Sequence, residues 1–133
     1  MFNSLAVFTT LCGNKVAVSK INIQRIISVL NPSHCEVVYH VLKDEEYVEK
    51  SLTVQGTLEQ VLKAFDEPDK FVVFTFPTGL KVALQRYQVS QVIDNSPTGN
   101  CEITFIGEAG GVHQELKYEV LGTFDQIIQS LTR

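Results

Sequence analysis

The fold of this chain is decided by a stretch that it contains twice: LAVFTTLCGNKVAVSK at residues 5–20 and FVVFTFPTGLKVALQR at residues 71–86. A shift of 66 positions extends the match without a gap over residues 5–65 and 71–131, where 15 of the 61 aligned pairs are identical. Unrelated sequences would share roughly four, because average composition gives about one chance match in seventeen pairs. The sequence therefore predicts one structural unit built twice.

The composition indicates a globular protein, with 44% hydrophobic and 20% charged residues among 133. We expect a first ββββα repeat at residues 1–66 and a second at residues 67–133. Units of about 60 residues are marginal alone, because they bury only about 60% of their unfolded surface. The connector at residues 66–70 is short. We therefore expect the two repeats to pack as one compact, pseudo-two-fold domain, a pseudo-dimer around a shared core.

Each unit opens with an apolar run, at residues 5–11 and 71–76, whose β-branched and aromatic content favours a strand. Gly13 and Gly79 then mark a tight reversal, where glycine adopts a positive φ at little cost. Return strands are predicted at residues 15–20 and 81–86. The less regular segments at residues 21–29 and 87–95 fit a bent strand better than a helix.

The clearest strands show alternation with period two. The positions expected to face the core are Cys35, Val37, Tyr39 and Val41 in the first copy and Cys101, Ile103 and Phe105 in the second. Partner strands are predicted at residues 47–54 and 113–120. The positions that alternate with the core-facing ones are expected on the opposite face of the sheet: Glu36, Val38 and His40 in the first copy, and Glu102, Thr104 and Ile106 in the second.

A short helix closes each unit, and its start is encoded by a T-x-x-Q capping box at Thr57–Gln60 and Thr123–Gln126. The apolar stripe expected to pack on the sheet is Leu58, Val61, Leu62 and Phe65, and in the second copy Phe124, Ile127, Ile128 and Leu131. The predicted fold class is thus α+β: two tandem repeats, each a four- to five-stranded antiparallel meander followed by one short helix.

This order of features resembles the FlbD family of small flagellar-associated proteins. The residues that carry the resemblance are Leu5–Thr10, Gly13, Lys15–Val18, Ile23–Ile27, Glu36–Val41 and Val54–Leu62, and their equivalents in the second copy. The resemblance implies the fold more than a function, and this sequence departs from the family in being duplicated. At the level of fold, the repeated order of strands and helix is also similar to the Whirly and PC4 class of single-stranded nucleic-acid binders.

Charge and cysteine content indicate a compartment and a partner class. A net charge of −4 is not typical of a dedicated nucleic-acid binder, although a local basic stripe would be compatible with it. The sequence has no apolar run long enough to cross a bilayer and no secretory signal pattern, so we expect no membrane association. Three cysteines with no paired close spacing favour free thiols in the cytoplasm.

The residue types that perform catalysis or bind metals do not form a recognisable motif here. The three histidines and three cysteines lack C-x-x-C or H-E-x-x-H spacing. Cys35 and Cys101 are expected to be small buried hydrophobic residues. Glu36 and Glu102, with Glu49 and Glu115, are expected on a solvated sheet face. We therefore predict a non-enzymatic protein with no catalytic residues, no cofactor and no metal.

A basic set supports an alternative function. Lys15 and Lys81 occupy equivalent positions, as do Lys20 and Arg86, while Arg25 and Tyr87 lie close to them in the sequence. Lysine and arginine neutralise phosphates, and aromatic rings stack on bases. These six residues would form a two-fold basic ridge for single-stranded nucleic acid. Residues 15 and 20 differ in strand parity, however, and solvated charges at strand ends are the simpler interpretation.

The sequence favours a binding or assembly protein as the first hypothesis, with a protein partner or self-association. Its working surface would be the face or groove shared by the two repeats, or an unpaired sheet edge that joins further copies. Single-stranded nucleic-acid binding is the second hypothesis, and an enzyme is the third.

Overall fold

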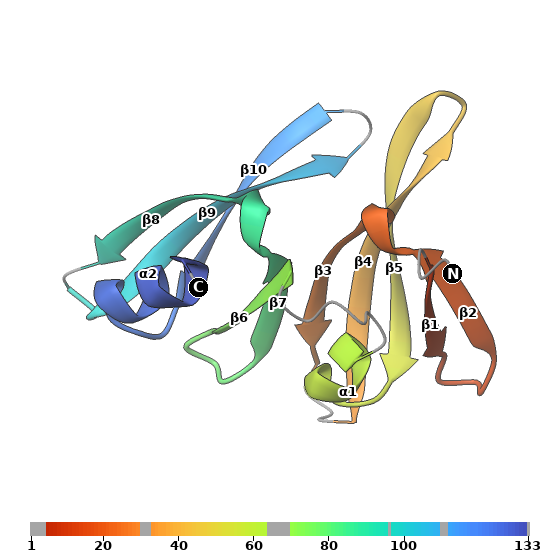
Figure 1. The fold of residues 1–133 in the computed structure, drawn as a ribbon, viewed down its shortest axis with the longest axis horizontal. Coiled ribbons are helices and arrows are strands. Elements are labelled where there is room, and N and C mark those ends of the chain that lie inside the picture. The colour runs from red at the N-terminus through yellow and green to blue at the C-terminus, as the bar shows by residue number, and fades with distance from the viewer. Residues whose placement is uncertain (1–4, 30–32, 64–69, 96, 110–111, 133) are drawn as a thin grey trace.

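The computed structural model describes residues 5–29, 33–63, 70–95, 97–109 and 112–132 (Figure 1). The first half contains β1 (Leu5–Thr9), β2 (Lys15–Ser19), β3 (Ile23–Ser28), β4 (His34–Lys43), β5 (Glu46–Gln55) and α1 (Leu58–Leu62). The second half contains β6 (Phe71–Thr75), β7 (Lys81–Gln85), β8 (Val89–Asn95), β9 (Asn100–Ala109), β10 (Val112–Val120) and α2 (Phe124–Thr132). All the paired strands are antiparallel, which confirms an α+β fold rich in antiparallel sheet.

Strand registers inside the second half match those inside the first after a shift of one repeat. In the opening hairpins, Val7 pairs with Ala17 and Val73 pairs with Ala83. The same shift relates the pairs Ile26–Val37 and Val92–Ile103, and the pairs Cys35–Val54 and Cys101–Val120. The shared sequence pattern therefore fixes the same local strand pairing twice.

The predicted continuous meander is wrong at one point in each half. β1 and β2 form a two-stranded sheet, and β3 does not pair with β2. A 3₁₀ turn, η1 (Lys20–Asn22), separates β2 from β3, and η4 (Arg86–Gln88) separates β7 from β8. These turns redirect the chain, so the strand that follows pairs elsewhere. The bent strand expected at both places is confirmed, because β3 and β8 each carry a register shift near their start.

The two halves are joined by strand pairing. β7 of the second half pairs with β3 of the first half, which creates a five-stranded sheet in the order β5-β4-β3-β7-β6. The aligned pairs are Arg25–Leu84, Ile26–Ala83 and Ile27–Val82. The counterpart of β7 is β2, so β3 and β7 are not equivalent strands. The joint is therefore head-to-tail, and the strand pairing of the described residues does not provide the expected two-fold arrangement.

The buried side chains form two clusters instead of the single shared core that we expected. The first-half core contains Ala6, Phe8, Ile26, Cys35, Val37, Val54 and Leu58 among its members, and it also takes in Phe71 and Ala83 from the second half. The second-half core contains Val72, Phe74, Val82, Leu84, Ile103, Phe105 and Ile127 among its members, and Ile27 from the first half packs against it. Each core is completed by residues from across the joint.

The local predictions for glycines and caps are confirmed, whereas the predicted alternation of strand faces holds only in part, because Val38 and Thr104 on the opposite face are buried and Tyr39 and Val41 are half-buried. Gly13 and Gly79 have φ values of 89° and 93°. The predicted inward positions of β4 and β9 are buried at Cys35, Val37, Cys101, Ile103 and Phe105.

Both capping boxes are complete, since Thr57 and Thr123 each exchange two hydrogen bonds with the glutamine three residues later. The predicted burial of Phe124 is wrong: it lies in the first turn of α2 and is 40% exposed. Phe65 and residues 66–69 of the connector lie outside the described residues. Neither helix of the described chain has the length and apolar character needed to cross a membrane.

Candidate functional site: the inter-half joint and the open strand edges

The joint between β3 and β7 is held by backbone pairing and by two polar side chains. The Ser28 hydroxyl accepts a hydrogen bond from the Lys81 amide at 2.6 Å and donates to the Lys81 carbonyl at 3.1 Å. The Gln85 side-chain amide donates to the Ile23 carbonyl at 2.7 Å. The joint is thus a fully formed strand interface, reinforced by side-chain hydrogen bonds to the backbone.

Arg25, one of the predicted nucleic-acid-binding residues, takes part in the packing around this joint. Its guanidinium lies 3.3 Å from a Glu49 carboxylate oxygen and 6.0 Å from the ring centroid of Phe105 in the other half. The arginine therefore links β3 to β5 by an ion pair and to β9 by a cation–π contact. Its charge is already engaged within the fold.

Two strand edges lie open at positions equivalent to this joint. Within the described residues, β2 has a strand neighbour only on its β1 side, and β8 has one only on its β9 side. These open edges of β2 and β8 are the repeat counterparts of the two edges that pair in the joint. Among the described strands, therefore, β7 and β3 pair with each other, whereas their counterparts β2 and β8 do not.

Side chains at the formed joint are more deeply buried than their counterparts at the open edges. Ala83 in β7 is fully buried, whereas its counterpart Ala17 in β2 is exposed. Phe71 is 7% exposed and its counterpart Leu5 is 54% exposed. Ile93 in β8 is 42% exposed, whereas Ile27 is half-buried against the second-half core. The open edges therefore present apolar side chains that are covered at the formed joint.

The two open edges lie at opposite ends of the molecule. Figure 1 shows the β1–β2 hairpin at one end of the long axis and β8 with α2 at the other. The two edges therefore cannot meet within one chain.

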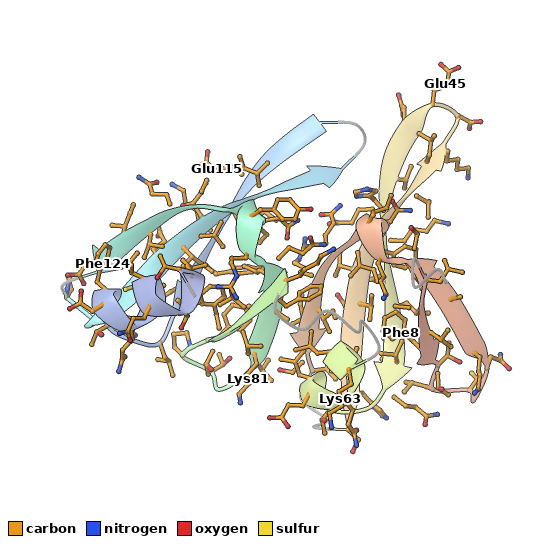
Figure 2. All side chains as sticks on the ribbon, viewed as in Figure 1. Phe8, Glu45, Lys63, Lys81, Glu115 and Phe124 are labelled. Carbon is orange, nitrogen blue, oxygen red and sulfur yellow. The ribbon has the colours of Figure 1, made fainter. Side chains whose placement is uncertain are left out.

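The other predicted basic residues are spread over the fold. Lys15 and Lys81 are exposed at the first residues of β2 and β7, where Figure 2 shows Lys81 pointing away from the sheets. Lys20 and Arg86 lie in the 3₁₀ turns beyond the other ends of these strands, and the Arg86 guanidinium donates to the Ser130 carbonyl at 2.5 Å. The lysines at positions 15 and 20 are thus separated by the length of β2.

A shallow groove lies between the two halves near the 3₁₀ turns. Its volume is about 390 Å³, and its lining includes Ile21, Gln24 and His40 from the first half and Tyr87 and Ser90 from the second. The Gln24 side-chain nitrogen lies 2.7 Å from His40 Nδ1. Tyr87 is 79% exposed at its rim. The walls of this groove combine aliphatic, aromatic and hydrogen-bonding groups.

The two equivalent cysteines are buried thiols with matching hydrogen bonds. Cys35 Sγ donates to the Gly56 carbonyl at 3.4 Å, and Cys101 Sγ donates to the Gly122 carbonyl at 3.5 Å. Burial raises the pKa of the Cys35 thiol, and burial together with the nearby Asp94 carboxylate raises the pKa of the Cys101 thiol. Both thiols therefore favour the protonated form and join the strand to the start of the following helix.

The paired carboxylates do not meet as a set. Glu36 and Glu102 are half-buried, Glu115 is exposed, and Glu49 is paired with Arg25. The part of the chain that the structure describes holds no group of three or more histidine, cysteine, aspartate or glutamate side chains arranged to bind a metal ion.

The comparisons with known proteins do not add a family to this description. No family model, curated protein or solved structure matches the chain. The resemblances to the FlbD family and to the Whirly and PC4 class remain predictions from the sequence.

Sequence reasoning named the open edge as a type of surface but missed the residues that form it. Those residues are Ala17 in β2 and Ile93 and Asp94 in β8, with Leu5 in the neighbouring strand β1, and none of them belongs to a catalytic or basic motif. A signal was present, because Ala17 is identical to Ala83 and Ile93 is identical to Ile27.

Proposed function

We propose that this chain is a tandem repeat of one strand-rich unit and that it acts as a non-catalytic assembly protein through its open strand edges. The observation that carries the proposal is the contrast between the formed joint and the open one. β7 pairs with β3. In the described chain, β2, the repeat counterpart of β7, and β8, the repeat counterpart of β3, each have an open edge. An assembly of several copies would cover these edges.

Physical chemistry favours a partner at such an edge. An open strand presents unpaired backbone N–H and C=O groups and is a template for pairing with another strand. Monomeric proteins blunt such edges with a charged residue, a proline or a very short strand. The lysine at the start of β2 does not act in this way, because Lys81 occupies the same position in β7 and β7 is paired.

Self-association is tested by sedimentation velocity and by light scattering over a wide range of protein concentration. We expect a mass above that of one chain, with a fraction of assembled protein that rises with concentration. Moderate salt should weaken the assembly only partly, because backbone pairing and apolar burial provide most of its stability. A mass equal to that of one chain at every concentration would contradict the proposal.

Single-stranded nucleic-acid binding is the second candidate, and the exposure of Tyr87 favours it. Its ring is 79% exposed next to Arg86 at the mouth of the inter-half groove, where a base could stack on it. The test is a titration with labelled single-stranded oligonucleotides at low and moderate salt. Binding that falls steeply with salt and is lost in Tyr87→Ala would support this function. An absence of binding at low salt would remove it.

A further inference from the structure

We infer that the open edge of β8 in one copy pairs antiparallel with the open edge of β2 in a second copy, in the register of the β3–β7 joint; this inference rests on the proposed assembly function. The new register follows when each β3 residue of that joint is replaced by its counterpart in β8 and each β7 residue by its counterpart in β2. The aligned pairs are Gln91 with the partner's Val18, Val92 with the partner's Ala17, and Ile93 with the partner's Val16. The partner is thus a second copy of this chain.

The backbone of β2 is oriented for this pairing. The Thr10 amide bonds to the Asn14 carbonyl, so the backbone groups of residue 14 point toward β1. Bonding sides alternate along a strand, so those of Lys15, Ala17 and Ser19 point to the open edge. In β7 the same positions, Lys81 and Ala83, point toward β3. β2 therefore presents the backbone groups that β7 uses in the formed joint.

The backbone of β8 is oriented as the backbone of β3 is in the formed joint. β8 pairs with β9 in the register that β3 has with β4, shifted by one repeat. Val92 thus takes the place of Ile26, the residue that pairs with Ala83. Its N–H and C=O groups point away from β9 and toward the open edge. Val92 and the partner's Ala17 would exchange the two hydrogen bonds at the centre of the new joint.

Side-chain burial gives the second line of argument. At the formed joint, Phe71 and Ala83 enter the first-half core, and Ile27 packs on the second-half core. By the same geometry, the partner's Leu5 and the partner's Ala17 would enter the second-half core of the copy that supplies β8. Ile93 would pack on the first-half core of the partner. The new joint thus covers apolar side chains that the single chain leaves exposed.

Charge complementarity favours a second copy over an unrelated strand. In the formed joint, Ser28 lies opposite Lys81 and accepts its amide hydrogen bond. The counterpart of Ser28 is Asp94, which is exposed in β8, and the counterpart of Lys81 is Lys15. The Asp94 carboxylate would accept the amide hydrogen bond of the partner's Lys15 and lie beside its ammonium group. The new joint gains an ion pair where the internal joint has a hydroxyl group.

The positions of the edges determine the kind of assembly. Because the two edges differ and lie at opposite ends of the chain, the contact is head-to-tail (Figure 1). Such a contact forms a ring if the rotation between copies closes, and a filament if it does not. Every copy then uses both of its edges, and each joint between copies resembles the one inside the chain.

Disulfide trapping tests the register. Val16 and the partner's Ile93 form a pair without backbone hydrogen bonds between them, with Cα atoms about 4.5 Å apart, which a disulfide can span. The exposed native thiol is first removed by Cys12→Ser. Val16→Cys and Ile93→Cys are then placed on separate chains, mixed and oxidised. We expect a disulfide-linked heterodimer of the two variants. Val7→Cys, one strand farther from the edge, is the matched control and should not link to Ile93→Cys.

A charge exchange tests the contact without any new bond. Lys15→Glu or Asp94→Lys alone should weaken self-association roughly tenfold, because like charges then lie opposite each other at every joint. Mixing the two variants restores opposite charges at every joint of an alternating assembly, because the lysine introduced at position 94 then faces the glutamate introduced at position 15, and Asp94 faces Lys15. Self-association should then return to the wild-type strength. Urea unfolding of each dilute variant should match the wild type, since both residues are exposed.

A proline substitution tests the backbone pairing. Ala17→Pro removes the N–H that points to the open edge and leaves the β1–β2 hydrogen bonds in place. It should abolish association, whereas Ala17→Ser, which keeps the N–H, should not.

The outcomes separate this inference from the proposed function. If the wild type assembles but the linked heterodimer is absent and the exchanged charges have no effect, the β2–β8 register is wrong and assembly uses another surface. Efficient linking of Val16→Cys to itself would indicate a two-fold contact and would also overturn the register. If the wild type remains a single chain at every concentration, the proposed function fails together with the inference.

Discussion

Strands β2 and β7 both begin with Lys-Val-Ala, yet their surroundings are opposite. β7 lies between β6 and β3, and its Ala83 is fully buried. β2 pairs with β1 in a two-stranded sheet, and its Ala17 is exposed. The valine and the alanine, in the same register with their hairpin partner, are thus fully buried in β7, whereas in β2 the valine is half-buried and the alanine is exposed. Burial here depends on which strand arrives from elsewhere in the chain.

The largest expected difference between the two strands concerns a charge at the matched alanines. Ala83→Asp would bury an unpaired carboxylate and should lower the free energy of unfolding by about 3 kcal/mol or more. Ala17→Asp places the carboxylate at an open edge and should change it by less than about 0.5 kcal/mol. Urea unfolding of dilute protein measures both. Similar losses for the two variants would show that β2 is covered in the single chain.

Removing the helix cap should lower the stability by the same amount in the two halves, in contrast to the substitutions in β2 and β7. Thr57→Ala and Thr123→Ala each remove the side-chain acceptor of a complete capping box and should cost about 1 kcal/mol of unfolding free energy. Thermal or urea unfolding gives the value, and Thr57→Ser and Thr123→Ser are the conservative controls. A large difference between the halves would mean that the caps depend on tertiary packing.

The hydrogen bonds between Ser28 and the Lys81 backbone allow a further comparison of equivalent positions. Ser28→Ala removes two hydrogen bonds to the Lys81 backbone and should cost about 0.5–1.5 kcal/mol. Asp94→Ala, at the counterpart position in the open edge of β8, should leave the stability of the dilute chain within about 0.5 kcal/mol of the wild type. Unfolding in urea at low concentration checks both values, and equal losses would contradict the assignment of β8 as an open edge.

The smallest expected effect is a loss of stability in alkaline solution. Burial raises the pKa of the Cys35 and Cys101 thiols in the folded chain. In the unfolded chain, a cysteine thiol has a pKa of about 8.5. The stability from the protonated thiols is therefore complete below that pH and falls as the pH rises through the folded-state values. Unfolding curves at several pH values measure this. Cys12→Ser should leave the fall unchanged, and Cys35→Ala should reduce it.

Local sequence predicted the parts of the fold that depend on neighbouring residues. The glycine reversals, both capping boxes and the burial of Cys35, Val37, Cys101, Ile103 and Phe105 were predicted, because each depends on residues only a few positions apart. The burial of Val38 and Thr104 on the opposite face was not predicted. The break of the meander at the 3₁₀ turns was missed. Phe124 was assigned to the apolar stripe by its spacing, but it lies in the first turn of α2, where it remains exposed.

The candidate site depends on contacts between distant residues and was less predictable. Arg25 was grouped with the basic residues, but in the fold it contacts Glu49 and Phe105, which lie on other strands. The residues of the open edges carry no motif, because strand pairing uses backbone groups that every residue supplies. The sequence signal is confined to Ala17, which is identical to the buried Ala83, and to Ile93, which is identical to the half-buried Ile27.

The sequence by itself determined the local parts of each half, namely the opening strands, the glycine reversals and the helix caps, from patterns that recur one repeat apart. The tertiary structure decided that β7 pairs with β3 and that, within the described residues, β2 and β8 each keep an open edge, at opposite ends of the molecule. Local patterns could not decide this, since β2 and β7 offer nearly the same backbone and side chains. The choice appears only in the pairing of β7 with β3, which joins residues 25–27 to residues 82–84, far apart in the sequence.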